Sequence, residues 1–236
     1  MQKPASPSPQ ARGAAATRRR PRGRSPRPAS RLPQLNTAVT DCSYASGETI
    51  YAQGDRADRI YEVVAGMVRT VCTTRDGRRV VHDFFVPGDV FGLAGARTHA
   101  STAEAVVDSR LKHCERVSAE RLALVDEAAA TTLWSWLTRG IEHATARASL
   151  LAHSDAREKV MGFLLEMADR LNAEQRFELA MSRYDIADYL GLSSETVSRA
   201  FTALRARGMI ALEGRRVVML EPMAQRRAVR AAEASD

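Results

Sequence analysis

The chain has 236 residues, a net charge of +7 and 44% hydrophobic residues, which is enough for one or two domains with a real core. It contains no run of about 18 apolar residues, which excludes a membrane-spanning helix. Its three cysteines, Cys42, Cys72 and Cys114, are too few and too far apart for a disulfide framework, a Cys-x-x-Cys zinc site or a four-cysteine iron–sulfur cluster. Scattered cysteines without a signal-peptide segment lead us to expect a reducing, cytoplasmic location.

Positive charge is concentrated at the start of the chain. Residues 1–33 are rich in Pro, Ser, Ala and Arg, contain no acidic residue, and hold nine of the 35 basic residues. This composition leaves almost nothing apolar to bury, so we expect a disordered basic tail that adds non-specific attraction to phosphates. An organelle transit peptide is the alternative, but no amphipathic pattern supports it. The rest of the chain has 26 basic and 28 acidic residues, so its overall charge does not indicate nucleic-acid binding. Such binding must be argued from individual segments.

Residues 34–129 have the pattern of short β-strands. Glycines recur between short apolar or alternating runs, which is typical of a sandwich or barrel. The dipeptide Asp76-Gly77 predicts a hairpin turn between strands at Val68–Cys72 and Val80–Phe85.

A helical period follows at residues 130–153. Six apolar residues recur at intervals of 4, 4, 3, 4 and 3, as in the seam of a coiled coil. They are Leu133, Leu137, Ile141, Ala144, Ala148 and Leu151. This helix could lie on its own domain or pair with a second copy of the chain. We favour a dimerisation helix, because Trp134 and Trp136 beside the seam suggest extra buried surface. Ser154 is expected to cap the helix that follows.

Residues 154–236 are expected to form a second, mostly helical domain, ended by a hairpin that turns at Glu213-Gly214. Within it, Ser182 can cap a helix with Asp185 as its capping-box partner, and Gly191 follows where a positive φ is needed. Ser193 or Ser194 can cap a second helix. The apolar positions of the two helices are Ile186, Ala187, Leu190, Val197, Phe201 and Leu204. The interval of 4 from Ala187 to Gly191 and then of 6 to Val197 predicts a helix-turn-helix rather than a plain helical hairpin.

The opposite face of the second helix carries polar side chains that suit DNA. Arginine offers a bidentate fork to guanine, glutamate accepts from the cytosine amino group, and serine serves several bases. The expected base-reading residues are Glu195, Ser198 and Arg199. Those expected on the phosphate backbone are Ser194, Thr202, Arg205, Arg207, Arg215 and Arg216. From Ser182 to Arg230 there are nine arginines against five acids, a local charge of +4.

These residues resemble the CRP/FNR superfamily of bacterial transcription regulators, and within it the FixK-like/FNR-like branch. The resemblance covers about residues 35–225, through Gly47–Asp55, Ile60–Arg69, Phe85–Gly92 and the recognition-helix run Glu195–Arg199. It implies a mixed α+β chain: a cyclic-nucleotide-binding-type β jelly roll, a long dimerisation helix and a C-terminal winged helix-turn-helix. It also implies a homodimer that binds double-stranded DNA at a TTGAT-type inverted repeat and works with RNA polymerase. The expected role is gene activation, in low-oxygen, nitrogen-fixation or respiratory control.

The sensor-like half departs from the CRP pattern. CRP-type sensors hold cyclic AMP with a Gly-Glu pair and an Arg-Ser pair, whereas here Leu93 follows Gly92, and Thr98 follows Arg97. Without those groups a buried phosphate would be uncompensated, so no cyclic nucleotide is expected and Arg97 is expected at the surface. The chain also has no cysteine before Cys42 for an FNR-type cluster, and its five histidines show no metal-ligand spacing. We therefore expect no cofactor and no metal.

Two alternatives to a regulator without an effector stay open at this stage. The first is an effector-gated, CRP-like regulator whose jelly roll binds a small molecule. The second is an enzyme, which no nucleophile–base pair, metal set or phosphate loop supports. Redox control through a cysteine is conceivable, although a packed cysteine is commoner.

Overall fold

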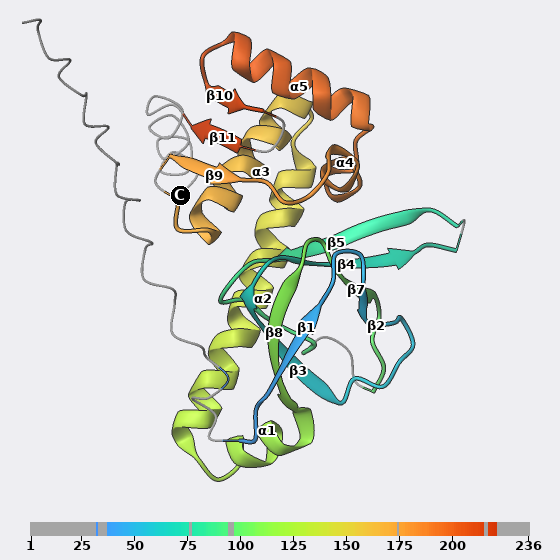
Figure 1. The fold of residues 1–236 in the computed structure, drawn as a ribbon, viewed down its shortest axis with the longest axis vertical. Helices are drawn as coiled ribbons and strands as arrows, with labels where there is room; N and C mark the ends of the chain where they lie inside the picture. The colour runs from blue at the N-terminus through green and yellow to red at the C-terminus, as the bar shows by residue number, and fades with distance from the viewer. Residues whose placement is uncertain are drawn as a thin grey trace, which may run out of the picture.

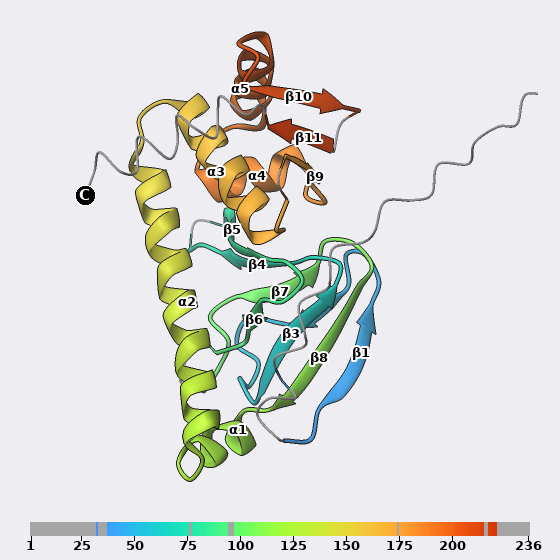
Figure 2. The ribbon, with the colours of Figure 1, turned by 90° about the vertical axis from the view of Figure 1, so that its left-hand side faces the viewer.

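The computed structural model describes residue 32 and residues 37–75, 77–93, 97–173, 175–214 and 217–220. A β jelly roll and a C-terminal helical head lie beside the two ends of one long helix, α2 (Figures 1 and 2). All of the expected tail except Leu32 lies outside the described residues, as do Arg215 and Arg216. No helix in the described ranges is long and apolar enough to cross a membrane.

The jelly roll consists of two antiparallel sheets of four strands each. One sheet has the order β1 (Thr40–Tyr44), β8 (Ser109–Glu115), β3 (Arg59–Ala65) and β6 (Val90–Phe91). The other has the order β2 (Thr49–Tyr51), β7 (Thr102–Ala105), β4 (Val68–Thr73) and β5 (Arg79–Phe85). The expected jelly roll and its β4–β5 hairpin are confirmed, with a bulge between Thr70 and Val71.

Aromatic and aliphatic side chains fill the space between the two sheets. The buried residues of this core are Tyr51, Tyr61, Val63, Val68, Phe91, Ala103 and Leu111. The ring of Tyr61 stacks on Phe91 at 5.2 Å between centroids, and Tyr51 stacks on His99 at 3.5 Å. One turn at this core requires glycine: Gly66 has a φ of +91°, and a Cβ there would lie 2.6 Å from Ser109 Cα.

The long helix α2 (Glu127–Ala152) follows a short helix, α1 (Arg116–Ala123), that the sequence did not predict. It begins three residues before the expected start, because Asp126 caps it by accepting from Ala129 N. The next helix, α3 (Ala156–Arg170), is capped by Asp155 and not by Ser154, so that expectation was wrong. Asp155 accepts from Arg157 N and pairs with the Arg157 guanidinium, and these hydrogen bonds hold the pKa of Asp155 below its usual value.

The apolar side chains of α2 divide between two faces. Ala129, Leu133 and Trp136 pack into a cluster with Leu32, Ile60, Cys114 and Ala119 of the same chain. The next stripe along the helix is uncovered: Trp134 is 73% exposed, Ile141 67% and Leu137 41%. Ala144 and Ala148 are also exposed, while Leu151 is half-buried. The helix therefore lies on its own domain along one face and leaves an apolar stripe free along another.

The head contains α3, the two helices α4 (Arg183–Leu190) and α5 (Ser194–Ala206), and a three-stranded sheet. Its sheet has the order β10 (Ile210–Glu213), β11 (Val217–Leu220) and β9 (Arg176–Glu178). The β10–β11 hairpin is as expected, whereas β9 was not predicted. Three rings join the head to the jelly roll, because Phe84 of β5 lies 5.3 Å from Tyr189 of α4 and 6.2 Å from Phe163 of α3.

Candidate nucleic-acid interface

The helix-turn-helix is built by two capped helices and one glycine turn. Ser182 Oγ accepts from Asp185 N at 3.1 Å and Asp185 Oδ2 accepts from Ser182 N at 3.2 Å, which is the expected capping box of α4. Gly191 ends α4 with a φ of 64°, in the left-handed region that favours glycine. Of the two expected caps for α5, it is Ser193 that accepts from Thr196 N, at 3.1 Å.

One side of α5 packs into the head. Val197, Ala200, Phe201 and Leu204 are buried, at intervals that follow the helical period. They pack in the same cluster as Ile186, Ala187, Tyr189 and Leu190 of α4. Burial of a side chain as large as Val or Phe contributes about 1.5–3 kcal/mol, so this face fixes which side of α5 points outward.

The other side of α5 carries the expected base-reading residues. Glu195, Ser198 and Arg199 are all exposed. Arg199 Nη2 lies 3.6 Å from Glu195 Oε1, and both side chains are more than 70% exposed. An ion pair this exposed is worth about 1 kcal/mol or less, so it leaves both groups available to DNA. In Figure 1, α5 lies at the far end of the molecule from α1, where a duplex can approach it.

The expected backbone-contacting residues lie around this face. Thr202, Arg205 and Arg207 are exposed, and Ser194 is half-buried at the first turn of α5. The hydroxyl of Ser198 donates to Ser194 O at 2.8 Å, and that of Thr202 donates to Ser198 O at 3.0 Å. Each hydroxyl oxygen keeps its acceptor capacity in this arrangement.

Arg183 is a residue of this unit that the sequence did not single out. Its guanidinium lies 3.2 Å from the centroid of the Phe201 ring, and so braces α5 from the start of α4. Its Nη1 is buried and makes no hydrogen bond to any described residue, and burial lowers the pKa of Arg183 to about 10. A polar residue at the first position of a capped helix gave no sequence signal for this role.

Comparisons with known proteins agree with this geometry. Residues 158–226 match the Crp-like helix-turn-helix domain family, and residues 41–125 match the cyclic nucleotide-binding domain family. The nitrogen fixation regulation protein FixK of Rhizobium meliloti is 37% identical over 190 residues, which is 78% of this chain and 84% of that protein. FixK of Azorhizobium caulinodans is 38% identical over 209 residues, which is 86% of this chain and 83% of that protein.

A solved structure is similar along most of the chain. The structure of FixK2 from Bradyrhizobium japonicum matches with a TM-score of 0.75 and 40% identity, over 80% of this chain and 95% of that chain. The chain belongs to the CRP/FNR family of transcription regulators and is FixK-like. The head is therefore the DNA-binding domain of this family.

The jelly roll of this FixK-like chain buries a histidine directly after Arg97 and Thr98, where its sequence departs from the CRP pattern. Arg97 is exposed, as expected, and its carbonyl accepts from Ala57 N. His99 is buried against Tyr51, and burial lowers the pKa of its imidazole. A neutral histidine stacked on tyrosine has no charge to offer a phosphate. Among the described residues, no group of three His, Cys, Asp or Glu side chains could hold a metal ion.

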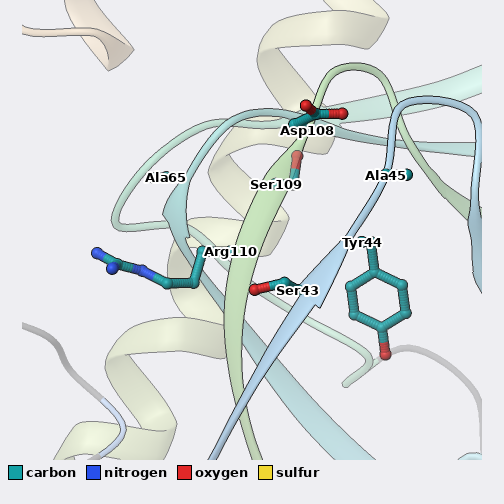
Figure 3. A pocket seen from close by; sticks show the side chains of 7 residues that line it. All are labelled: Ser43, Tyr44, Ala45, Ala65, Asp108, Ser109 and Arg110. Atoms are coloured by element: carbon teal, nitrogen blue, oxygen red, sulfur yellow. The ribbon is translucent and has the colours of Figure 1, made fainter.

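A hollow of about 510 Å³ lies at one end of strands β1, β3 and β8 (Figure 3). It is lined by Ser43, Tyr44, Ala45, Ala65, Asp108, Ser109 and Arg110. Two of its polar groups already serve the fold: Ser109 Oγ accepts from Met67 N at 3.0 Å, and Asp108 Oδ1 accepts from Ser46 N at 2.9 Å. We therefore do not assign a ligand to this hollow.

Proposed function

We propose that this regulator binds a TTGAT-type inverted repeat as a homodimer and activates transcription through RNA polymerase. We propose the domain limits as residues 34–126 for the jelly roll with α1, 127–153 for the dimerisation helix and 154–236 for the head. The basic tail, expected over residues 1–33, then ends before Leu32, because that side chain is buried against α2. The observation that carries the proposal is the outward face of α5, where Glu195, Ser198 and Arg199 stand exposed on a helix whose other side is buried.

Base reading by this face follows from hydrogen-bond chemistry. Arg199 would donate two hydrogen bonds to the guanine of the half-site, and Glu195 would accept from the amino group of the cytosine paired with it or of an adjacent base. Ser198 would complete the contact. The residues proposed for the phosphate backbone are Ser194, Thr202, Arg205, Arg207, Arg215 and Arg216.

Dimerisation is supported by the free stripe on α2. The exposed side chains of Trp134, Leu137 and Ile141 follow one another at intervals of 3 and 4, which is the spacing of a coiled-coil seam. Exposed rings and aliphatic groups in a row need a cover, and a second α2 with the same stripe supplies it through two-fold symmetry. Leu133, which the sequence predicted in the seam, packs into its own domain. We therefore propose a seam of Leu137, Ile141, Ala144, Ala148 and Leu151, extended by Trp134.

Control without a bound small molecule is the form of regulation that we propose. The aromatic and aliphatic core between the two sheets supports it, and so does the lack of the CRP-type Gly-Glu and Arg-Ser pairs at Gly92-Leu93 and Arg97-Thr98. The alternative is an effector-gated regulator. Relatives named nitrogen fixation regulation protein FixK and transcriptional activator protein FnrL support activation in nitrogen-fixation or low-oxygen control. We propose a cytoplasmic location, because the protein must reach DNA.

The test is a binding measurement with purified protein and a labelled TTGAT-type palindrome, with no additive. We expect half of the labelled palindrome to be bound at a nanomolar concentration of dimer, with an affinity that falls as the salt concentration rises. A matched duplex with both half-sites scrambled is the control. Binding that requires an added small molecule would favour the effector-gated alternative, and equal binding of both duplexes would overturn sequence-specific recognition.

A further inference from the structure

One carboxylate serves both the helix-turn-helix and the jelly roll. Asp185 Oδ2 accepts from Ser182 N and Ser182 Oγ, at 3.2 and 2.8 Å, and so closes the cap of α4. The other oxygen, Oδ1, lies 2.9 Å from Nη1 of Arg69, on strand β4 of the jelly roll. The side chain of Asp185 is only 7% exposed, so water screens this pair weakly.

A second arginine of the same hairpin reaches the next turn of α4. Arg79, on β5, lies 3.0 Å from Asp188 Oδ2 and 3.4 Å from Asp185 Oδ1. On the jelly-roll side, Glu104 of β7 holds Arg69 at 2.8 Å. We call these five residues the hairpin–head clamp: Arg69, Arg79, Glu104, Asp185 and Asp188.

The clamp and the apolar junction hold α4 at different points. The ring of Tyr189 packs on Phe84, and Arg147 of α2 donates to Tyr189 O at 3.3 Å and to Val81 O at 2.8 Å. In both ribbon views the β4–β5 hairpin lies between the rest of the jelly roll and the head (Figures 1 and 2). With the packing of Tyr189 alone, α4 could still turn about that contact. The ion pairs of Asp185 and Asp188 oppose this rotation.

We propose that Arg69 and Arg79 are positioning residues for DNA recognition, which set the angle of the head against the jelly roll. Because α4 and α5 pack through a buried face, an arginine that fixes α4 also fixes the recognition helix. In a dimer, this angle determines the distance and rotation between the two recognition helices. The clamp therefore selects the spacing between half-sites and leaves base preference within each half-site to α5. This inference rests on the proposed function as a dimer on an inverted repeat.

The experiment is a binding series on palindromes that share one half-site and differ by single base pairs in the spacer. Each added base pair rotates one half-site by roughly 35° about the duplex, so a fixed head angle fits one spacing best. The variants are Arg79→Glu, Asp188→Arg, and the two together, with Arg78→Glu as the matched control. Arg78 is an exposed neighbour on the same hairpin and lies outside the clamp. Thermal unfolding is measured for every variant.

Wild-type protein is expected to prefer one spacing. Arg79→Glu is expected to lose about tenfold at that spacing and to bind the neighbouring spacings nearly as well, because the clamp no longer fixes the angle of the head. The double variant restores opposite charges between positions 79 and 188 but still places a carboxylate near Asp185 and Glu104. It should therefore recover part of the wild-type spacing preference, while Arg78→Glu should keep all of it. Base preference within the half-site should stay the same in all variants.

Three outcomes would overturn the clamp. The first is a spacing preference that Arg79→Glu leaves intact, whatever its overall affinity. The second is a double variant no closer to wild type than the single variants. If Arg79→Glu does not fold, the double variant Arg79→Gln with Asp188→Asn gives the same test. The third outcome is a spacing preference that this neutral double variant leaves unchanged. Wild-type protein that binds no palindrome at any spacing would instead overturn the proposed function, and the clamp with it.

Discussion

Arg170 of α3 lies 2.9 Å from Asp89, in the turn between β5 and β6, and its guanidinium also donates to Phe84 O. Its side chain is 6% exposed. Burial alone would lower the pKa of Arg170, but the carboxylates of Asp89 and Asp83 outweigh it and raise that pKa. A charged side chain of the DNA-binding head is thus held at the junction with the jelly roll by the carboxylates of Asp83 and Asp89.

The carboxylates around Arg170 predict a pH dependence. Burial raises the pKa of Glu166 above its usual value of 4.5, although Arg170 opposes this. A carboxylate whose pKa is higher in the folded state binds its proton more tightly there. Its ionisation therefore costs stability as the pH rises from about 4.5 through the folded pKa. Glu166→Gln removes this cost and keeps a hydrogen-bond acceptor for Arg170.

We expect the stability of Glu166→Gln relative to wild type to increase between pH 4.5 and pH 7. Denaturant unfolding at several pH values measures the difference directly. Asp169→Asn is the control, because Asp169 is exposed on the same helix. A difference that stays constant or falls with pH over this range would contradict the burial of an ionised carboxylate at this junction.

The turn of the helix-turn-helix predicts a sharp effect of a single methyl group. Gly191 has a φ of +64°, and a Cβ there would meet nothing within 4 Å, so the cost of Gly191→Ala is conformational and not steric crowding. We expect a loss of about 1–2 kcal/mol in the free energy of unfolding. Gly140→Ala is the control, because Gly140 lies inside α2 with open space around it, and this change should add up to about 1 kcal/mol. If Gly191→Ala and Gly140→Ala changed the free energy of unfolding equally, a side chain at position 191 would not strain the turn.

Local chemistry explains why the sequence predicted the helix-turn-helix well. The capping box of Ser182 and Asp185 and the positive φ of Gly191 depend on residues within one turn of each other. The same holds for the β4–β5 hairpin, because only five residues separate the paired Thr73 and Arg79. Where two neighbouring residues could both cap a helix, as at Ser154 and Asp155, the sequence gave no way to choose.

Long-range pairing explains what the sequence could not predict. The hairpin arginines of the clamp lie more than 100 residues from the aspartates of α4, so no spacing rule brings Arg69 to Asp185. Strand β9 has only three residues, too few to show an alternating pattern, and it depends on pairing with β11. The apolar period of α2 predicts Leu133 in the dimer seam. In the structure Leu133 packs into its own domain instead, and its neighbour Trp134 is exposed.

The free stripe of α2 predicts dimerisation through Ile141. In a dimer, Ile141→Asp would place a carboxylate in an apolar seam, at a cost of about 3 kcal/mol or more for each buried charge. Sedimentation should then show monomers at concentrations where wild-type protein is dimeric, and palindrome affinity should collapse. Ala146→Asp, at an exposed position on another side of α2, should leave the dimer intact. If Ile141→Asp stayed dimeric, the exposed stripe of α2 would not be the dimer interface.

The most direct test of the account is a binding selection on randomised half-sites with wild-type protein, Arg199→Ala and Arg205→Ala. If Arg199 reads the guanine, its loss should cost about 1–3 kcal/mol per half-site and relax the preference at that G·C pair alone. Arg205 is exposed near the end of α5. Its replacement by alanine should instead weaken binding to all sequences alike and reduce the salt dependence of binding, because phosphates carry no sequence information. An Arg199→Ala protein that keeps the wild-type base preferences, beside an Arg205→Ala protein that changes them, would contradict the assignment of the recognition face.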